Sequence, residues 1–513
     1  MASILTNTSA MVALQNLRTI NNNLVDTQNQ ISTGRKISSA TDNSAIWAVS
    51  KVIESDVNAF KAISDSLNLG DSTVAVAREA SETITDLLTE LKGNIVASQE
   101  ENVDRTKIQA DIDAKVAQIQ SIVDAASFNG LSLVEGTEDV SILGSLVRDG
   151  SGTVTSSDID ISRRDLTTSA GSIGSASTDN LANAVIQNSA TAIESAGVTT
   201  DITFAATWAA NDTVTLTVDG FEIGYTAGGA DTTVIANDVA GLINALGLEG
   251  VEASNTAGVL EITSTRAFEG LRITNDGGTT AGDGTVAITD DGSGSGLTGT
   301  NSATDSTSSA RAEEIRFSTT AQVNEGDGYG VTVGTNTYNY IAGPDENFGD
   351  VARGLKAAID GAGLAGVTTR VSENADGSFG LLIDNDGSGS ASLALARTAT
   401  EDGIASGGLF GLQNINVTTD EGASAALDNI DTFLNTAIDA AASFGSDQSR
   451  IELQSGFISK LTDSLKVGIG SLVDADLEAA SARLQALQVQ QQLGIQSLSI
   501  ANQAPQSILS LFR

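Results

Sequence analysis

The chain has 513 residues, with 65 acidic and 26 basic side chains and a formal net charge of −39, a length that predicts about three or four domains. Neither cysteine nor histidine occurs, which excludes disulfides, thiolate metal sites and a Ser-His-Asp triad, whereas paired carboxylates remain open as catalytic groups. The acidic surplus argues against nucleic acid and anionic membrane surfaces as partners, because both require clustered lysine and arginine.

Charge is distributed unevenly along the chain. Residues 1–40 carry three basic side chains and one acidic side chain, and residues 479–513 carry two basic side chains and no acidic one. The acidic surplus therefore lies in the middle. Ends that are almost neutral can pack together without repulsion, whereas an acidic middle repels its neighbours and stays solvated.

The first residues, MASILTNTSAMVALQNLRTINNN, lack the basic start and the apolar run of a secretory signal. No stretch approaches the roughly 18 uninterrupted apolar residues of a membrane-spanning helix, so no membrane insertion is expected. If the protein leaves the cell, it is expected to use another export route.

Residues 3–33 are predicted to form one amphipathic helix. Apolar or amide side chains recur every three or four residues, as on one face of a helix. They are Met11, Leu14, Leu17, Ile20 or Asn21, Leu24, Gln28 and Ile31. Glycine enters only at Gly34, and the polar segment STGRKISSATDNSA (32–45) predicts a turn-rich break.

Two further helices are predicted in the N-terminal part, over about 45–97 and 104–126. The first shows apolar marks at helical spacing, among them Ile63, Leu67, Ile84 and Leu88. The second holds a stripe of isoleucines and ends at the turn signal FNG (128–130).

The C-terminal part mirrors this arrangement. Residues 424–468 are predicted to be helical, VGIGSLVDAD (467–476) is expected to be a glycine break, and 474–503 is expected to be the last helix. One apolar stripe of that helix is Leu477, Ala480, Leu484, Leu487 and Leu498, and a second stripe is Val489, Leu493 and Ile500. A helix that is apolar on two faces needs partners on two sides.

In the middle of the chain, roughly residues 140–410, the spacing of apolar residues changes to a period of two. DTVTLTVDGFEIGYTAG (212–228) predicts a hairpin that turns at Asp219-Gly220, followed by a helix over 235–248 and two strands. The same order recurs about 113 residues later, from DGYGVTVGTNTYNYIAG (327–343) onward. The sequence therefore predicts two small modules of pattern ββαββ, joined by a Gly/Ser/Asp/Thr-rich linker near 275–312.

The short motifs that could carry chemistry do not support a site. DNDGSG (384–389) resembles the start of a calcium loop, but its twelfth position is Leu395 rather than glutamate. GSGSGLTG (292–299) has no preceding strand and no P-loop lysine. Carboxylates are abundant, but no pair is placed in an aromatic-lined cleft. No catalytic, cofactor-binding or metal-binding residue is predicted.

Periodicity alone leaves open how the two chain ends bury their apolar stripes. They could bury each other within one monomer as a local bundle, or they could pack against other chains. A pair of helices buries only one face of each helix. The neutrality of the ends and the second stripe of the last helix favour packing against further chains.

Both ends of the chain resemble bacterial flagellin. ISTGRKISSATDNSA (31–45) is similar to the family signature after the first helix, roughly L-S-[ST]-G-x-[RK]-I-[NS]-S-A-x-D-D-A-A. ASFNGLSLV (126–134) resembles the family's end of the third helix, and residues 470–513 resemble its C-terminal helix, most closely in the alphaproteobacterial branch. The resemblance covers about 1–135 and 424–513, and the middle repeats resemble flagellin IN modules.

The resemblance implies an α + β multidomain fold. Its core is a long α-helical, coiled-coil-like pairing of N- and C-terminal segments, with two β-rich α+β outer modules inserted between them. The expected domains are a core helix and spoke (1–44), a helical domain with a β-hairpin region (45–175), outer module 1 (176–300), outer module 2 (301–405), the C-terminal half of the helical domain (406–468) and a C-terminal core helix (469–513).

The resemblance also implies a structural role rather than an enzyme. Flagellins are exported through a flagellar channel and self-assemble by their terminal helices into a helical polymer, the extracellular filament used for swimming motility. A homopolymer, an export chaperone, a filament cap protein and hook–filament junction proteins are the expected partners, and no cofactor is expected. The expected subunit-assembly residues are Leu5, Leu14, Leu17, Ile20, Leu24, Ile31, Leu477, Leu484, Leu487, Val489, Leu493, Leu498 and Ile500.

The family is also recognised by an innate immune receptor, through an arginine and a leucine in a stretch like L-Q-R-V-R-E-L-A. The matching stretch here is LTELKGNIV (88–96), in which Glu90 replaces the arginine and Asn94 replaces the leucine. Weak or absent recognition is therefore expected.

Two alternatives stay open. A hook-associated junction protein of the flagellum shares terminal helical stripes but usually lacks this complete pair of end signatures. A secreted glycan-active enzyme with helical ends would require a carboxylate pair in an aromatic-lined cleft.

Overall fold

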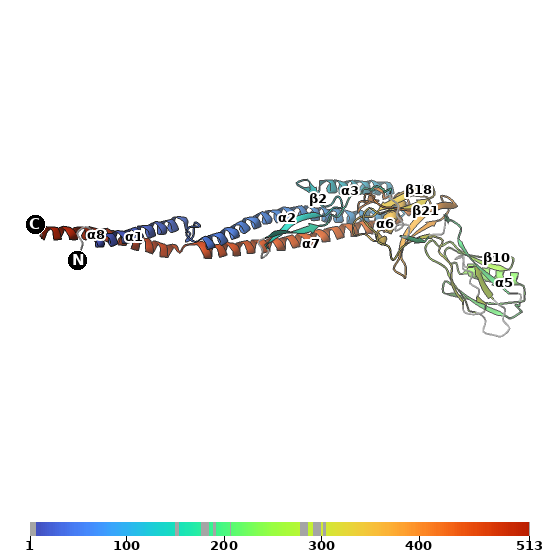
Figure 1. Ribbon diagram of the computed structural model, residues 1–513. Coiled ribbons are helices and arrows are strands. Elements are labelled where there is room, and N and C mark those ends of the chain that lie inside the picture. The colour runs from blue at the N-terminus through green and yellow to red at the C-terminus, as the bar shows by residue number, and fades with distance from the viewer. Residues whose placement is uncertain are drawn as a thin grey trace. The chain divides into compact units, whose positions relative to one another are not determined.

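The computed structural model describes residues 7–148, 153–175, 184–187, 191–205, 207–276, 286–290, 299–300 and 304–511. Helices are formed by both ends of the chain, and strands are formed mainly by its middle (Figure 1). The chain divides into two compact units. Unit 1 comprises Met1–Ser72, Ser141–Ile161 and Ser446–Arg513, and unit 2 comprises Thr73–Val140 and Ser162–Gly445.

Helix α1 spans Thr8–Thr33. It begins where the side chain of Asn7 accepts a hydrogen bond from the backbone N–H of Ala10, which satisfies one of the free donors of the first turn. It ends at Gly34, whose φ of 69° is a left-handed conformation that glycine adopts without steric cost. The helix predicted from the first apolar stripe is confirmed over the described residues.

The other helices follow the predicted periodicity. Helix α2 spans Ser44–Ser98, α3 spans Arg105–Ala125, α7 spans Asp420–Val473 and α8 spans Leu477–Leu511. Fully buried side chains recur along α2 at steps of three, four, seven and ten residues. They are Ile63, Leu67, Val74, Ile84, Leu88, Leu91 and Ile95. This spacing places one face of a very long helix in the core.

The glycine break expected over 467–476 is wrong in its first half. Helix α7 continues through Gly468 and Gly470 to Val473, because a glycine inside a helix costs only about 1 kcal/mol. The helix ends where the carbonyl of Val473 accepts from the N–H groups of Lys36 and Ile37. The next helix starts at Asp476, whose carboxylate accepts from the first backbone N–H groups of α8.

Helices α1 and α8 lie side by side and antiparallel in unit 1 (Figure 1). At one end of the pair the Asn7 side chain donates to the carbonyl of Ala501, 2.8 Å away, and near the middle Gln491 donates to Asn21, 2.7 Å away. At the other end Arg35 forms an isolated antiparallel bridge with Asp474. The two chain ends therefore pair over the whole of α1.

Short hairpins accompany the helices. Strand β1 (Ser127–Phe128) pairs with β2 (Leu131–Ser132), and β3 (Val140–Arg148) pairs with β4 (Val154–Ile161). In unit 1, a Cβ added to Gly70 of α2 would lie 2.4 Å from Ile142 of β3. The hairpin therefore packs directly against the helix backbone at that glycine.

Module 1 contains two antiparallel sheets, of order β10-β11-β7-β13-β14 and β15-β12-β8-β9, together with helix α5 (Thr232–Ala245). Its strands are β7 (Val198–Phe204), β8 (Thr213–Val218), β9 (Phe221–Thr226), β10 (Val251–Thr256), β11 (Val259–Ser264), β12 (Arg272–Asp276), β13 (Val286–Asp290), β14 (Gly299–Thr300) and β15 (Thr304–Thr307). The predicted hairpin turn is confirmed, because Asp219 and Gly220 both have positive φ, 53° and 82°.

Module 2 repeats this plan with sheets of order β19-β20-β16-β5 and β18-β17-β21-β6, together with helix α6 (Phe348–Asp360). Its strands are β5 (Val185–Gln187), β6 (Ala192–Glu194), β16 (Glu313–Phe317), β17 (Gly328–Val333), β18 (Asn336–Ile341), β19 (Val367–Glu373), β20 (Phe379–Asn385) and β21 (Ser392–Thr400), and the short 3-10 helix η1 (Leu412–Asn414) follows. The expected fold class, a helical core with two β-rich modules, is confirmed.

Strand pairing shows a nested arrangement of the two modules along the chain. Strands β5 and β6 precede module 1 in sequence, but they pair with β16 and β21 of module 2. The domain boundaries expected from the sequence stay predictions, and this pairing assigns residues 185–187 and 192–194 to the sheets of module 2.

Candidate functional site

Six of the predicted assembly residues lie on two opposite faces of α8. Positions 480, 484, 487, 494 and 498 of α8 are buried or half-buried, and they lie on the side that packs against α1. Val489, Leu493 and Ile500 lie two residues beyond positions 487, 491 and 498, and position 491 is also half-buried and bonds to Asn21 of α1. Two residues correspond to a rotation of about 200° around the helix axis. Val489 and Leu493 therefore point away from α1, whereas Ile500 borders an open groove next to α1.

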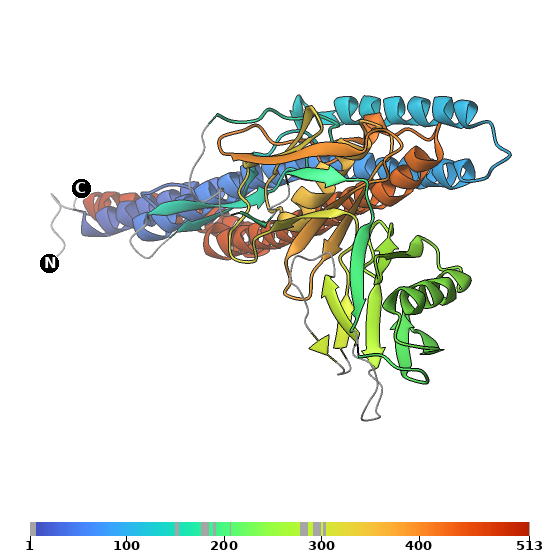
Figure 2. The same ribbon diagram turned by 90° about the vertical axis from the view of Figure 1, so that its right-hand side faces the viewer.

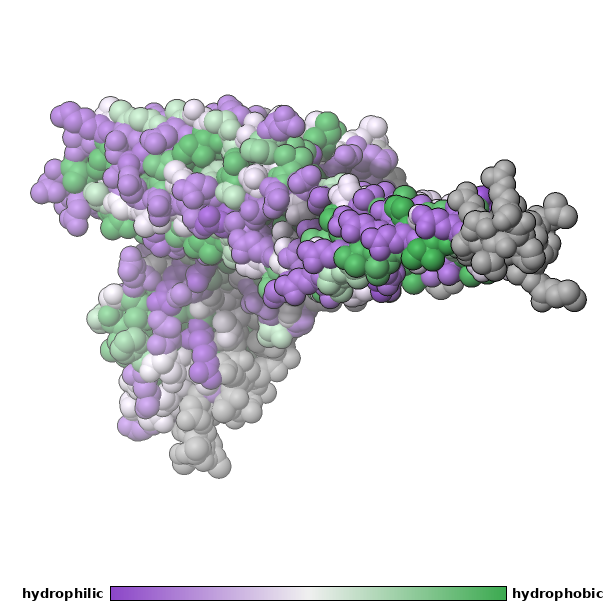
Figure 3. All heavy atoms as spheres, turned by 90° about the vertical axis from the view of Figure 1, so that its left-hand side faces the viewer, coloured by the Kyte–Doolittle hydropathy of each residue, from purple (hydrophilic) through white to green (hydrophobic). Residues whose placement is uncertain are grey.

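The exposed fractions of these side chains match this geometry. Val489 and Leu493 are each 55% exposed and Ile500 is 68% exposed, whereas Leu487 is 7% exposed. Near the chain ends, hydrophobic side chains reach the surface among hydrophilic ones (Figure 3). The pairing of α1 with α8 buries one stripe of α8 and leaves the other in solvent.

The remaining predicted assembly residues divide in the same way. Half-buried ones are Leu17, Ile20, Leu24, Ile31, Leu484 and Leu498. Leu14 and Leu477 are exposed, at 40% and 50%. Leu5 lies outside the described residues. The N-terminal stripe thus mainly faces α8.

Four further exposed apolar side chains on these helices were not predicted to be assembly residues, although Met11 was assigned to the apolar stripe of the first helix. They are Met11, Val12, Val25 and Ile495, each more than half exposed. Val12 and Ile500 line an open groove of about 650 Å³ between α1 and α8, together with Thr8, Ala13 and Ala501. Met11 and Val25 are fourteen residues apart and share one side of the helix, so both could have been assigned from the sequence to a second stripe instead of Met11 to the first.

The two positions expected to affect immune recognition lie on α2 and contact α3. The Lys115 ammonium forms an ion pair with Glu90, which raises the pKa of Lys115. The side chain of Asn94 donates to the carboxylate of Asp111. Both side chains therefore have partners within the helical part of unit 2.

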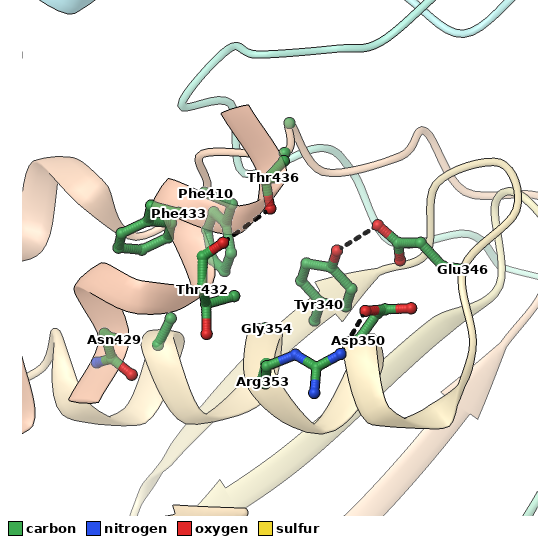
Figure 4. Close-up of a pocket in the computed structure, with 13 residues that line it drawn as sticks. Tyr340, Glu346, Asp350, Arg353, Gly354, Phe410, Asn429, Thr432, Phe433 and Thr436 are labelled. Carbon is green, nitrogen blue, oxygen red and sulfur yellow. Dashed lines mark hydrogen bonds and ion pairs between the residues drawn. The ribbon is translucent and has the colours of Figure 1, made fainter. Parts of the chain in front are cut away.

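A polar cavity of about 70 Å³ lies in unit 2, between α6 and α7 (Figure 4). In it, the Tyr340 hydroxyl donates to Glu346, 2.8 Å away, and Arg353 donates to Asp350, 2.6 Å away. Burial raises the pKa of Glu346 to about 7, and it also raises the pKa of the Tyr340 hydroxyl well above its usual value. Sequence reasoning missed these residues, because no periodic pattern marks them.

The size of this cavity limits what it can do. Seventy cubic ångströms is room for about two water molecules. The adjoining cavity, which Arg163, Arg164 and Asp345 help to line, is about 200 Å³. Both are smaller than the roughly 300–1,000 Å³ of ordinary small-molecule sites. The buried carboxyl is therefore better explained as part of the packing between α6 and α7 than as a substrate site.

In the part of the chain that the structure describes, no helix has the combination of length and apolar character that a membrane crossing requires. Within the same residues, no three histidine, cysteine or acidic side chains are grouped so that they could hold a metal ion.

Comparison with known proteins assigns both helical regions to one family. The bacterial flagellin N-terminal helical region matches residues 4–139, and the bacterial flagellin C-terminal helical region matches residues 427–512. A solved hook-associated protein-3 from Legionella pneumophila aligns with 82% of this chain and 98% of its own, at 10% identity and a TM-score of 0.31. That likeness is too low to carry an argument.

Similar flagellins match this chain over its full length. Flagellin A of Rhizobium meliloti is 30% identical over 518 residues, and Flagellin B of the same organism is 31% identical over 518 residues, with all of both chains covered in each case. Flagellin FljO of Caulobacter vibrioides is 42% identical over 138 residues, which cover 26% of this chain and 50% of that protein. The chain therefore belongs to the bacterial flagellin family and is a structural subunit of the flagellar filament.

Proposed function

We propose that this flagellin is held in its filament by the apolar face of α8 that α1 leaves uncovered. This uncovered face consists of Val489, Leu493 and Ile500. The observation that carries the proposal is that these side chains stay more than half exposed although α1 already packs against the other side of α8. A soluble chain seldom keeps a continuous apolar stripe in water unless another surface covers it.

The energetics of such a contact are adequate. Burying a half-exposed aliphatic side chain contributes about 1 kcal/mol. Three such residues, together with Met11, Val12 and Val25 of α1, would contribute about 6 kcal/mol for each subunit before the cost of ordering is subtracted. Every subunit in a polymer contacts several others, so modest contacts accumulate.

Charge supports the same assignment. The uncovered face and its neighbours carry no acidic side chain between residues 479 and 513. Identical surfaces can therefore approach one another without repulsion, whereas the acidic middle of the chain keeps subunits and filaments apart.

The test replaces two residues of the uncovered face with carboxylates. Purified Val489→Asp/Leu493→Asp subunits are expected to need at least about tenfold higher concentration to polymerise onto filament seeds, because a charge must be buried at each contact. Gln488→Asp/Ser499→Asp adds the same charge to exposed positions of α8 outside the stripe. It is expected to polymerise almost normally. Equal behaviour of the two variants, measured by sedimentation and electron microscopy, would reject the proposal.

Removal of either chain end is a second test of the same idea. Deleting about 30 residues from the N- or the C-terminus is expected to abolish polymerisation. The two modules should stay folded, because each has its own buried core. Loss of the strand signal in circular dichroism would instead point to general unfolding.

Family membership supports a place outside the cell, in the filament, with no catalytic, cofactor-binding or metal-binding role for this chain. We infer that the export chaperone, the filament cap protein and the hook–filament junction proteins are its further partners. Antibody labelling of intact cells, and co-purification from cells that express the chain, test location and partners separately.

Weak recognition by the innate immune receptor remains our proposal for Glu90 and Asn94. Their contacts with Lys115 and Asp111 support it, since they fix an acidic and an amide side chain where related flagellins present an arginine and a leucine. A receptor-activation assay that gave the response of an enteric flagellin would contradict this.

A further inference from the structure

The internal repeat places two equivalent helices, α5 and α6, in different surroundings. Helices α5 and α6 hold equivalent places between a hairpin and a pair of strands. The Asn244 side chain near the end of α5 bonds to the backbone of Ala253, and the equivalent Asp360 of α6 accepts from the hydroxyl of Thr369. Both pairs are offset by the same 116 positions, so the residues of the two helices can be matched one by one.

The outer face of α6 is covered by the chain itself. A Cβ on Gly361 would lie 2.7 Å from the Cβ of Asn414, and a Cβ on Gly411 would lie 3.0 Å from the Cβ of Ala357. The short segment between β21 and α7 therefore packs directly on the small residues of α6. Buried Lys356 adds a hydrogen bond to α7.

The equivalent face of α5 is open. Positions 357, 358 and 361 of α6 correspond to Gly241, Leu242 and Ala245 of α5, and all three are exposed. A Cβ on Gly241 would meet no atom within 4 Å. Leu242 is 41% exposed, and Val234 on the same side of the helix is 50% exposed. Figure 2 shows α5 on the outside of its module, with no described element over this side.

The open face of α5, defined as Val234, Asn237, Asp238, Gly241, Leu242, Ala245 and Leu246, is almost uncharged. Asp238 is its one ionisable side chain, and that carboxylate accepts a hydrogen bond from Tyr225 at 2.9 Å. The position of Lys356 is taken by Ala240, which is 5% exposed. Helix α5 of module 1 therefore presents an apolar face equivalent to the covered face of α6. It lacks, however, the lysine with which α6 contacts α7.

We propose that the open face of α5 is a docking surface for a neighbouring copy of this chain in the filament. The inference rests on the proposed assembly of the chain into a filament. There, neighbouring modules are present at an effective concentration on the order of millimolar, at which a weak apolar contact is filled. A second copy is the occupant because this face bears a single carboxylate on a chain of net charge −39, so the face can approach another acidic chain with little repulsion.

The test uses the absence of cysteine from the chain. Leu242→Cys gives a single thiol on the open face, and Ser254→Cys gives a single thiol on exposed strand β10, on the other side from buried Ala253. Each full-length variant is labelled with a maleimide, first as heat-dissociated subunits and then as filaments assembled from the purified protein alone. A thiol that is covered nine-tenths of the time reacts about tenfold more slowly.

The expected result is that Leu242→Cys labels about tenfold more slowly in filaments than in subunits. Ser254→Cys should label at equal rates in both states. Filaments in which Leu242→Cys labels as fast as in subunits would overturn the docking surface and leave the filament role intact. Failure of the unsubstituted chain to form filaments would overturn both.

Discussion

Glu346 shows how one buried carboxyl can make stability depend on pH. It lies in the loop between β18 and α6, where burial raises its pKa to about 7 although Tyr340 and the N–H of Gly343 bond to it. Asp350 raises the pKa further, and Arg353 lowers it. The folded chain therefore keeps a proton on Glu346 at pH values where the unfolded chain has already lost it.

The sign of the effect follows from proton binding. Between pH 4.5 and about 7 the folded state binds more protons than the unfolded state, so the stability that Glu346 contributes is present below pH 4.5 and is lost as pH rises through 7. The full loss is on the order of 3 kcal/mol.

Glu346→Gln should remove this part of the pH dependence, because glutamine has no proton to lose. Urea unfolding of dissociated subunits at pH 4.5, 6 and 7.5 measures it. Exposed Glu373→Gln is the matched control and should keep the slope of the unsubstituted chain. If Glu346→Gln kept that slope as well, burial of the charge would not be its cause.

This residue could not have been found from the sequence. Glu346 follows Pro344 and Asp345 in a turn-like stretch, where a solvated acid is the usual interpretation. Its environment is made by Phe433 and Thr436, about 90 positions away. Periodicity reports which side of an element is buried, but it does not report which distant element covers a loop.

Among the elements, the helices were predicted well and the sheets only in part. The stripes of α2, α3 and α7 repeat over many turns, so local spacing was sufficient. The hairpins and their following helices were also found, since their turns carry Asp-Gly or Gly. Strands β5 and β6 were not found, because they are three residues long and their partners lie more than 120 positions away.

Two glycines inside helices should respond to the same substitution in opposite directions. Gly456 of α7 has open space where a Cβ would stand, whereas a Cβ on Gly354 of α6 would lie 2.3 Å from the ring of Tyr340. Gly456→Ala is therefore expected to stabilise the chain by up to about 1 kcal/mol, because alanine loses less backbone entropy. Gly354→Ala should destabilise it by about 1–3 kcal/mol through overpacking.

Thermal unfolding of dissociated subunits, followed by circular dichroism, compares the two variants with the unsubstituted chain. A rise in melting temperature for Gly354→Ala would show that the Tyr340 ring can move aside at little cost. A fall for Gly456→Ala would show that α7 needs glycine at that position for a reason other than helix formation.

For the whole molecule, the pairing of α1 with α8 leaves the ends incompletely covered. Isolated helices gain most of their stability from packing, and one helix pair buries only one face of each. We therefore expect weak amide-exchange protection of α1 and α8 in dissociated subunits and strong protection in filaments. Helix α3, with Ile112 and Ile119 fully buried, should be protected in both states. Strong protection of α1 and α8 before assembly would contradict this expectation.

The nested order of the strands determines which segment of the chain recombination can exchange as a unit. The chain enters module 1 after β6 and leaves it before β16, and beside the second crossing the N–H groups of Arg311 and Ala312 donate to the carbonyls of Arg266 and Ala267 within module 1, at 3.0 and 2.9 Å. Recombination can therefore exchange residues 198–307 as a single cassette while every strand of module 2 keeps its partner. Module 1 can therefore change in sequence while α1 and α8, through which we propose that the copies assemble, stay the same.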